Sequence, residues 1–553
     1  MTTADLIFHG GSLFSAGAST SRPAAVAVSD GVIIAIESDA DILKYRGPST
    51  EVIDLAGGLL LPGFQDAHVH PLTAGIELQQ CDLSGAEDAA DCLRLIGEYA
   101  AAHPDLDWIL GGGWSMDFFP GGVPTRHSLD EIVPDRPVLL MNRDHHDAWV
   151  NSVALNRAGV TAATPDPSGG RIARDTDGSP IGTLHEAAFE LMSEVRPSID
   201  LEFAYAGLLK AQDKLFSLGI TGWQDAYVPA VHANGDFLDA YLLAIERGTL
   251  RARVTAGLWW EREEGLEQLP FLADRRARAA AAAPAERFTA GTVKIMVDGV
   301  AENQTAAMSS PYLDACGHAT DNSGLSFIDK DKLKDYVTAL DASGFQVHFH
   351  ALGDRGVSEA LDAVEAARTT NGTSAIRHHL AHLQVIAKND VARFAELNAS
   401  ANLQSLWACR DKQSVELTYP FLEPELIVQH YPFGDLERAG THLVAGSDWP
   451  VSSANPLLAT HVAVNRTEPG GSSEPPLGEG QGLSLATALT AYTAGSATIN
   501  GRDDIVGRIE VGYLADLTVL DRDPFTRPVG EIAETSVVST WIDGVCVFNR
   551  DER

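Results

Sequence analysis

A closely spaced pair of histidines is the first feature of this sequence that could do chemistry. His68 and His70 lie one residue apart in QDAHVH, directly after the apolar run GGLLLPGF. Alternate side chains of a β-strand point to the same face, so both imidazoles are expected to face one point. Imidazole is a common metal ligand, and this geometry suits two ligands of one ion. The alternative is a pair of ordinary histidines on a half-buried strand.

A lysine lies inside a second apolar segment, where Lys294 occupies the third position of TVKIMVDG. Burying an unpaired ammonium group is costly, so this lysine needs a partner. One interpretation is a salt bridge to a nearby carboxylate. The other is carbamylation by carbon dioxide, which would give a carboxylate that bridges two metal ions. A lowered lysine pKa in a metal pocket would favour that reaction.

Further histidines end two later segments. His350 ends QVHFH, where His348 shares its strand face, and spacing alone does not choose between the two. His382 ends HHLAH, with His378 on the same strand parity and His379 on the other. Each of these residues, taken singly, is more often structural than a ligand.

An aspartate completes the set. Asp448 ends THLVAGSD, immediately after a Gly-Ser pair. A His-x-His pair, a lysine, two more histidines and an aspartate therefore fall at separate strand-like segments of one chain. Together they favour a metal site over a series of unrelated structural residues.

The elements that must position these residues are eight apolar, strand-like runs. The runs are 59–68, 219–227, 253–260, 292–299, 344–351, 378–385, 400–408 and 441–448. Helix-like stretches separate most of them, and this alternation predicts an α/β fold, a (β/α)8 TIM barrel. Chemistry in that fold lies at the C-terminal ends of the strands, where the polar candidates of this chain fall.

One interval is too long for a barrel connection. About 150 residues separate the first and second runs, which predicts a subdomain inserted after strand 1, at about residues 76–198. The segments GGGWS and RDHHDAWVNS lie within it. Insertions at this point commonly shape the pocket.

Both ends of the chain have the same texture of short apolar strands and tight turns. We predict that residues 1–60 and 500–553 form one composite β-sandwich, with the metal-binding barrel and its insertion at residues 61–499.

The composition excludes several classes of partner. The 553 residues carry a formal net charge of −36, which argues against nucleic acid and anionic membranes because both bind basic surfaces. No apolar run approaches the ~20 residues of a membrane span, and the N-terminus lacks the pattern of a signal peptide. Five scattered cysteines without a CxxC motif fit reduced thiols. We expect a cytoplasmic protein that binds a small-molecule substrate, and a homodimer is left open.

These motifs together resemble the metal-dependent amidohydrolase superfamily, in particular the branch of N-substituted formamide deformylases. PGFQDAHVHP is similar to the first-strand signature, VKIMVDG to the strand-four lysine motif, VHFHALGDR to strand five and AGSDWP to strand eight. The segments GGW and RDHHDAWVNSVAL resemble branch-specific parts. The resemblance covers essentially the whole chain. One departure is Ala381, where related sequences commonly have Glu, so any support for the strand-six histidine must come from elsewhere.

The resemblance implies a set of site residues. The implied metal ligands are His68, His70, Lys294, His350 and His382, and the implied catalytic residue is Asp448. It thereby selects His350 over His348 and His382 over its neighbours. Neutral imidazoles and carboxylates suit one or two divalent ions, with Zn²⁺ favoured and Mn²⁺ or Fe²⁺ as alternatives.

A hydrolytic mechanism follows from these ligand types. Such a metal lowers the pKa of its water to roughly 7, and Asp448 is expected to act as general base and then general acid. Trp114, Arg143 and His146 are candidates for substrate contact or for a second electrophile. The leading function is cleavage of a linear amide, such as an N-substituted formamide.

Two other functions are alternatives. The first is cyclic-amide opening or deamination on the same scaffold. Deamination is disfavoured because no Glu follows His350 in the pattern HxxE. The second is a metal-free barrel scaffold, which the complete ligand set disfavours.

Overall fold

The centre of the computed structural model is an eight-stranded barrel sheet. The structure describes residues 3–231, 235–372, 374–471 and 474–552. Neighbouring strands of the sheet are all parallel, in the order β23-β22-β21-β20-β19-β18-β15-β8. They are β8 (Phe64–Val69), β15 (Ile220–Val228), β18 (Arg253–Trp259), β19 (Phe288–Met296), β20 (Gln346–Ala351), β21 (His379–His382), β22 (Ser400–Leu403) and β23 (His442–Ala445). Each strand overlaps one of the eight predicted runs, so the predicted (β/α)8 barrel is confirmed.

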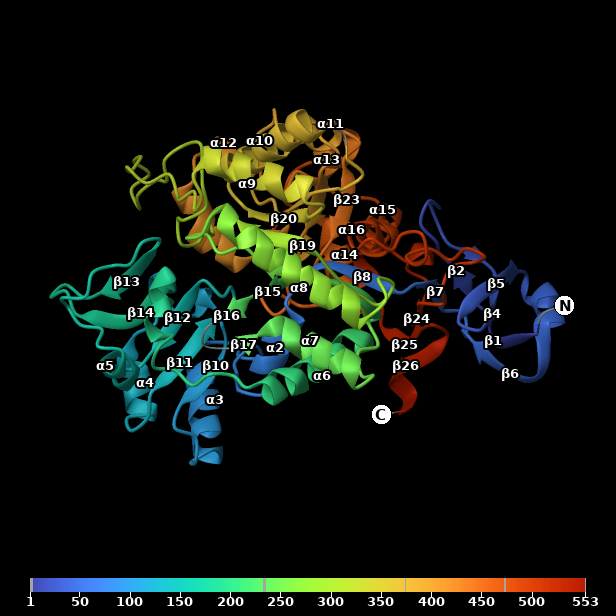
Figure 1. Cartoon of the computed structure of the whole chain (residues 1–553), viewed down its shortest axis with the longest axis horizontal. Helices are drawn as coiled ribbons and strands as arrows, with labels where there is room; N and C mark the ends of the chain where they lie inside the picture. Colours follow the sequence, from blue (N-terminus) through green and yellow to red (C-terminus); the bar gives the residue numbers. More distant parts are fainter. Residues whose placement is uncertain (1–2, 232–234, 373, 472–473, 553) are drawn as a thin grey trace.

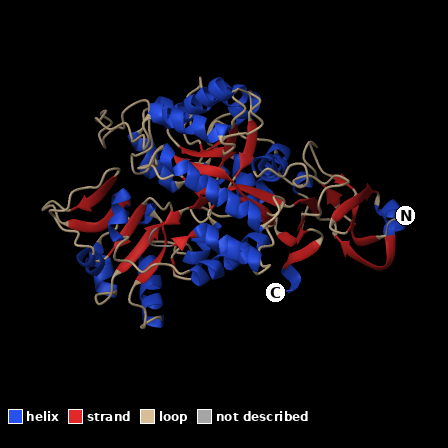
Figure 2. Ribbon diagram, viewed as in Figure 1, coloured by secondary structure: helices blue, strands red, loops and turns tan. Residues whose placement is uncertain are grey.

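A helix follows each barrel strand, and together these helices surround the sheet (Figure 1, Figure 2). Parallel strands need such crossovers because a short turn cannot join them. The helices are α6 (Leu201–Ser217), α7 (Phe237–Glu246), α8 (Leu269–Ala282), α9 (Lys330–Ala342), α10 (Asp354–Asn371), α11 (Val391–Glu396), α13 (Phe433–Arg438) and α14 (Pro456–Asn465). Within the described residues, no helix has both the length and the apolar character needed to cross a bilayer.

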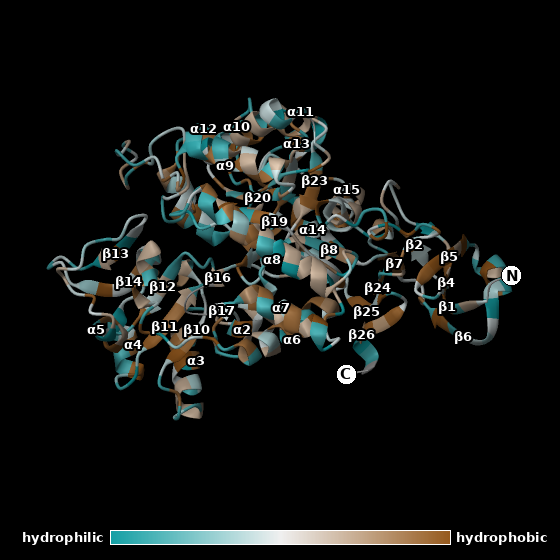
Figure 3. Ribbon diagram, viewed as in Figure 1, coloured by the Kyte–Doolittle hydropathy of each residue, from teal (hydrophilic) through white to brown (hydrophobic). Residues whose placement is uncertain are grey.

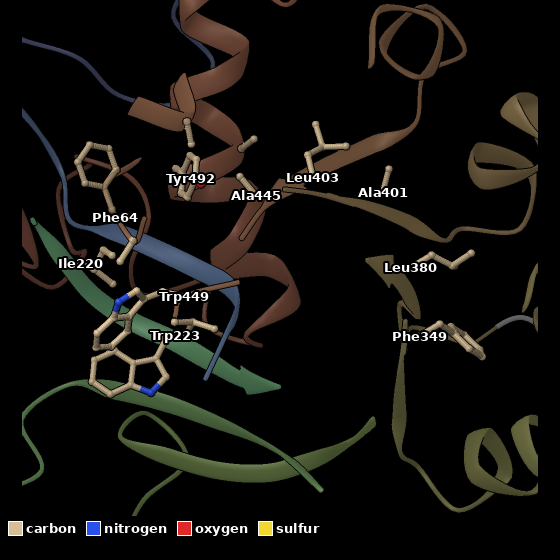
Figure 4. Packing of buried hydrophobic residues seen from close by; sticks show 14 of the residues in the cluster. Phe64, Ile220, Trp223, Phe349, Leu380, Ala401, Leu403, Ala445, Trp449 and Tyr492 are labelled. Carbon is tan, nitrogen blue, oxygen red and sulfur yellow. The ribbon is translucent and has the colours of Figure 1, made fainter. Parts of the chain in front are cut away.

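Strand alternation divides the barrel into an apolar layer and a polar interior. Phe349, Leu380 and Leu403 lie in the main apolar core (Figure 4). The same core contains Leu361 of α10. Because successive side chains point to opposite faces, the neighbours of Phe349 on β20 face the barrel interior. The strand pattern therefore aims histidines inward and apolar residues at the helices.

The barrel closes just beyond the ends of its first and last strands. The N–H of Asp448 donates to the carbonyl oxygen of His68 at 2.8 Å, and the N–H of His70 donates to that of Trp449 at 2.9 Å. These backbone hydrogen bonds bring the His-x-His pair and the last-strand aspartate together, although 378 residues separate His70 from Asp448.

Both ends of the chain build one sandwich beside the barrel. One sheet holds β5 (Val32–Glu37), β4 (Ala25–Ser29), β1 (Ala4–His9) and β6 (Arg46–Asp54). The other holds β26 (Val545–Asn549), β25 (Val537–Ile542), β24 (Leu517–Leu520), β7 (Leu59–Pro62), β2 (Ser12–Leu13) and β3 (Arg22–Pro23). Strands β7 and β24 pair antiparallel, which joins the two ends as predicted.

A shared apolar core holds the two sheets of the sandwich together. Phe8 and Val26 from the first sheet pack with Leu60, Val519 and Trp541 from the second. Figure 3 shows hydrophobic residues concentrated on β1 and β4. The boundaries at residues 60 and 500 stay predictions, and Gly63 alone separates β7 of the sandwich from β8 of the barrel.

The long interval after the first barrel strand contains the inserted subdomain, which has a mixed sheet of its own. Its order is β13 (Gly170–Arg174), β14 (Pro180–Glu186), β12 (Asp147–Val150), β11 (Val138–Asn142), β10 (Ile109–Trp114) and β9 (Cys81–Asp82). Helices α3 (Ala89–Ala102), α4 (Arg126–Ile132) and α5 (Ser152–Arg157) accompany it. In Figure 1 this insertion lies on the opposite side of the barrel from the sandwich.

Candidate metal centre and active site

Asp448 is the meeting point of the site. Its Oδ1 lies 2.8 Å from Nε2 of His70 and 3.0 Å from Nε2 of His68. Its Oδ2 lies 3.8 Å from Nδ1 of His382. These side chains come from the C-terminal ends of β8, β21 and β23, where a barrel carries its chemistry. The barrel thus brings together four of the residues named from the sequence.

The arrangement fits a metal ion. One ligand atom each from His68, His382 and Asp448 lies within 4.8 Å of the others, and all three residues are buried. Among the described residues, Nε2 of His68 contacts Asp448 without the geometry of a hydrogen bond, and Nδ1 of His382 is buried without a hydrogen-bond partner. Buried polar atoms are normally paired, so two orphaned imidazole nitrogens facing one carboxylate indicate a cation between them.

The protonation states match those of metal ligands. Burial lowers the pKa of His68 to about 3 and lowers that of His382 well below its usual range. Burial alone would raise the pKa of Asp448, but the neighbouring histidines hold it well below its ordinary value. Neutral imidazoles beside an ionised carboxylate are the forms that bind Zn²⁺.

Backbone strain turns two of these side chains into the site. His382 has φ 78° and Asp448 has φ 56°, in the left-handed region that non-glycine residues rarely adopt. Strict alternation would place His382 on the same face as Leu380, in the apolar core. The positive φ ends the strand and redirects the imidazole toward Asp448. Such strain persists where the surrounding structure enforces it and is concentrated at functional sites.

His350 lies at the edge of this cluster. Its ring centroid is 4.4 Å from that of His382, and its Nε2 lies 3.4 Å from the carbonyl oxygen of Gly299. Burial lowers its pKa well below the usual range, so it is neutral. The predicted ligand His350 therefore lies within the cluster, and its binding of metal stays a prediction.

Lys294 is buried on the strand before β20, with 2% of its surface exposed. It forms no salt bridge with any described residue, although the charges of Asp448 and Asp298 act on it. Burial lowers the pKa of Lys294 to about 7, against the effect of those two carboxylates. A neutral amine is the form that reacts with carbon dioxide, so this environment suits carbamylation, which stays a prediction.

Two of the histidines that the resemblance set aside, His348 and His379, form a layer under the site. Nε2 of His348 lies 2.8 Å from Nδ1 of His68, and the rings of His348 and His379 lie 4.0 Å apart. Nε2 of His379 in turn lies 2.9 Å from Oε1 of Gln224. His348 therefore contacts a candidate ligand at its second nitrogen, the position that outer partners of metal-binding histidines occupy.

Gln404 contacts the backbone of His382, which lacks the preceding Glu that related sequences commonly have. Ala381 occupies that position and is buried, while Oε1 of Gln404 accepts the backbone N–H of His382 at 2.6 Å. Gln404 lies one residue after β22, so support for the strand-six histidine comes from the neighbouring strand.

The insertion places two consecutive histidines beside the cluster, each with a carboxylate. Nδ1 of His146 lies 2.8 Å from Oε2 of Glu186, and its ring is 5.7 Å from that of His350. Nε2 of His145 lies 3.5 Å from Oε1 of Glu77. Burial would lower the pKa of His146, but the charge of Glu186 and the hydrogen bond to it raise that pKa to about 9.

The other two candidates of the insertion are placed differently. Trp114 is completely buried, packs against Phe119 and Trp149, and donates its indole N–H to the carbonyl oxygen of Leu140. The backbone N–H of Arg143 donates to the carbonyl oxygen of Trp114. Trp114 therefore packs the core of the insertion, and substrate contact by Trp114 or Arg143 stays a prediction.

Sequence reasoning missed Glu186, Glu77 and His145 as parts of the site, and it set His348 aside in favour of His350. The available signal was the type of residue in RDHHDAWVNS and TLHEA, where histidines and carboxylates occur in otherwise apolar strands. Their pairing spans 40 residues between His146 and Glu186 and could not be read from spacing.

Comparison with known proteins agrees with this geometry. The amidohydrolase family pattern matches residues 51–548. The chain is 30% identical over 552 residues to protein LONG AFTER FAR-RED 3 of Arabidopsis thaliana, covering 98% of this chain and 91% of that one. It is 27% identical over 571 residues to the N-substituted formamide deformylase of Arthrobacter pascens, covering 99% and 98%.

A solved structure has a similar fold. It is an uncharacterized metal-dependent hydrolase from Pyrococcus horikoshii, with a TM-score of 0.70 and 24% identity, covering 95% of this chain and 99% of that one. The likeness extends over the barrel, the insertion and the sandwich.

Proposed function

We propose that this chain, a metal-dependent hydrolase that belongs to the amidohydrolase family, cleaves the C–N bond of a small linear amide. N-substituted formamides are the leading substrate class. The observation that carries the proposal is the buried Asp448 carboxylate, ionised between His68, His70 and His382. The deformylase of Arthrobacter pascens, similar over nearly the whole of both chains, supports the formamide class.

The ligand set would be His68, His70, His350 and His382, with carbamylated Lys294 if two ions bind. Orphaned buried nitrogens on His68 and His382 support this assignment. Zn²⁺ is the ion that best suits neutral imidazoles and carboxylates, and Mn²⁺ or Fe²⁺ are alternatives. A divalent ion held there would activate a water molecule at neutral pH and polarise the substrate carbonyl.

Asp448 would move the proton. Its carboxylate is ionised and faces the centre of the cluster, so it can accept a proton from the attacking water. It would then give this proton to the leaving nitrogen as the C–N bond breaks. Because its Oδ1 contacts both His68 and His70, the carboxylate is held in place during both transfers.

A deaminase or cyclic-amide hydrolase is the alternative on this scaffold. The carboxylate that follows His350 in sequence, Asp354, begins α10, where its Oδ1 accepts the backbone N–H of Ser309 at 2.8 Å. Asp354 is held there by this hydrogen bond and does not point to the histidine cluster, so it cannot replace the Glu that deamination would use. This contact favours amide hydrolysis over deamination.

The test combines metal content with turnover. Protein purified without chelator should contain one or two equivalents of a divalent metal. It should hydrolyse at least one compound in a screen of formamides, N-acyl amino acids, aryl amides and cyclic amides. Metal-free protein with an intact fold would overturn the proposal, and turnover of only cyclic amides or amino-substituted heterocycles would select the alternative. A cytoplasmic location and a homodimer remain predictions.

A further inference from the structure

The pair formed by His146 and Glu186 joins two neighbouring strands of the insertion. The backbone N–H of Glu186 donates to the carbonyl oxygen of His146 at 2.6 Å, and Oε2 of Glu186 lies 2.8 Å from Nδ1 of His146. Glu186 is 7% exposed. The imidazole is therefore held at Nδ1 by both the position and the charge of its partner, while Nε2 forms no hydrogen bond with any described residue.

The second oxygen of Glu186 is held by the barrel. Oγ1 of Thr305, on the connection after β19, lies 2.8 Å from Oε1 of Glu186. A Cβ atom on Gly299 would lie 2.2 Å from Oγ1 of Thr305 and 2.9 Å from Oε1 of Glu186, so only glycine allows this approach. The carbonyl oxygen of the same Gly299 lies 3.4 Å from Nε2 of His350. One loop therefore contacts both the carboxylate and a candidate metal ligand.

A second pair, formed by Asp147 of β12 and His185 of β14, contacts the same connection after β19. Asp147 and His185 are register partners, with Nδ1 of His185 2.7 Å from Oδ1 of Asp147. Asn303 donates to the same Oδ1 at 3.0 Å. Insertion and loop are thus joined through both carboxylates, which fixes the distance between His146 and the barrel mouth.

Glu186 occupies this position at a conformational cost. Its backbone has φ 51° and ψ −133°, a combination that non-glycine residues rarely adopt. A glutamate kept in this conformation, with both oxygens bound, indicates that the carboxylate is needed where it lies.

We infer that Glu186 is a positioning residue that holds His146 with its free Nε2 toward the substrate. His146 would donate a hydrogen bond to the carbonyl oxygen as negative charge develops on it. This inference rests on the proposed amide hydrolysis and adds a specific electrophile to it. His146 is protonated at both nitrogens in this role, with Nδ1–H donated to Glu186 and Nε2–H to the carbonyl oxygen, and neither proton is transferred.

A double-mutant cycle tests the inference, with formanilide as the probe because hydrolysis releases aniline. Glu186→Ala should lower kcat about 10- to 100-fold, because misplaced catalytic donors lose most of their effect, while metal content stays unchanged. In a His146→Ala background the same substitution should have no further effect on kcat. Glu186→Gln should retain more activity than Glu186→Ala, because its amide oxygen can still accept from Nδ1–H. Glu131→Gln, at an exposed position of α4, serves as the matched control.

An NMR measurement on ¹⁵N-histidine-labelled protein keeps the test independent of the substrate. The Nδ1 resonance of His146, assigned with His146→Gln, should report a bound proton in the wild type and change in Glu186→Ala. An unchanged resonance, or an additive cycle in an active enzyme, would overturn the inference. A wild type that hydrolyses no amide, with the resonance as expected, would overturn the proposed function instead.

Discussion

Nε2 of His348 lies 2.8 Å from Nδ1 of His68, directly under the candidate metal centre. This contact uses one nitrogen of His68 and leaves the other, Nε2, facing Asp448 at 3.0 Å. The ring orientation and the tautomer of a metal-binding histidine are set by the partner of its second nitrogen. His348 is therefore expected to control how well His68 binds metal.

Replacing His348 with Phe should weaken metal binding about 10- to 100-fold, because His68 would lose the partner that orients it. Competition with a chelator of known affinity measures the effect. His442 lies at the N-terminal end of β23, the end opposite the candidate metal centre. His442→Phe is therefore the matched control and should leave metal affinity unchanged. Equal affinity in His348→Phe and wild type would show that His68 needs no such support.

Lys294→Ala should contain less metal than the wild type, because the bridging carboxylate would be lost. Short carboxylic acids added to the variant should restore part of the metal and activity. Intact-protein mass spectrometry under non-acidic conditions should detect the added carbon dioxide on the wild type. An unmodified lysine in metal-loaded, active enzyme would contradict bridging and favour a single ion.

Arg253 connects the barrel to the sandwich. Its Nε lies 2.6 Å from Oδ2 of Asp516 and its Nη2 lies 2.9 Å from Oδ1, with 2% and 1% of the two side chains exposed. Arg253→Met should lower the free energy of unfolding by about 3–5 kcal/mol, because it leaves the buried Asp516 without its counter-charge. Urea unfolding measures this loss.

The double variant Arg253→Met with Asp516→Leu separates charge from packing. It should recover part of the stability that Arg253→Met loses, since the buried carboxylate is removed and Asp543, the other partner of Arg253, keeps its ion pair with Arg287. Metal content should match that of the wild type in both variants. A loss below about 1 kcal/mol in Arg253→Met would mean that water solvates Asp516 and that the pair is not a structural link.

The barrel could be predicted because its strands are continuous apolar runs, which is typical of parallel strands buried on both faces. The direction of His382 could not, because alternation places it with Leu380 and only a positive φ turns it into the site. The shared face of His68 and His70, by contrast, was readable from their spacing, and both contact Oδ1 of Asp448.

The insertion shows the limit of sequence reasoning more clearly. Its existence followed from the length of one connection, but its contribution to the site depends on pairing between β12 and β14. Trp114 was singled out as an aromatic residue in a glycine-rich segment, and it packs in the core of the insertion. Glu186 was passed over because its partner His146 lies 40 residues away.

The central claim is that Asp448 accepts the proton of the attacking water. Asp448→Asn keeps the size of the side chain and one oxygen but cannot take up this proton. The most direct measurement is the single-turnover rate of Asp448→Asn, with metal stoichiometry determined on the same sample. We predict a folded variant that keeps most of its metal, while the rate falls by about 10²- to 10⁴-fold, the usual effect of losing a general base. A metal-loaded Asn variant that hydrolyses within a few-fold of the wild-type rate would contradict the account.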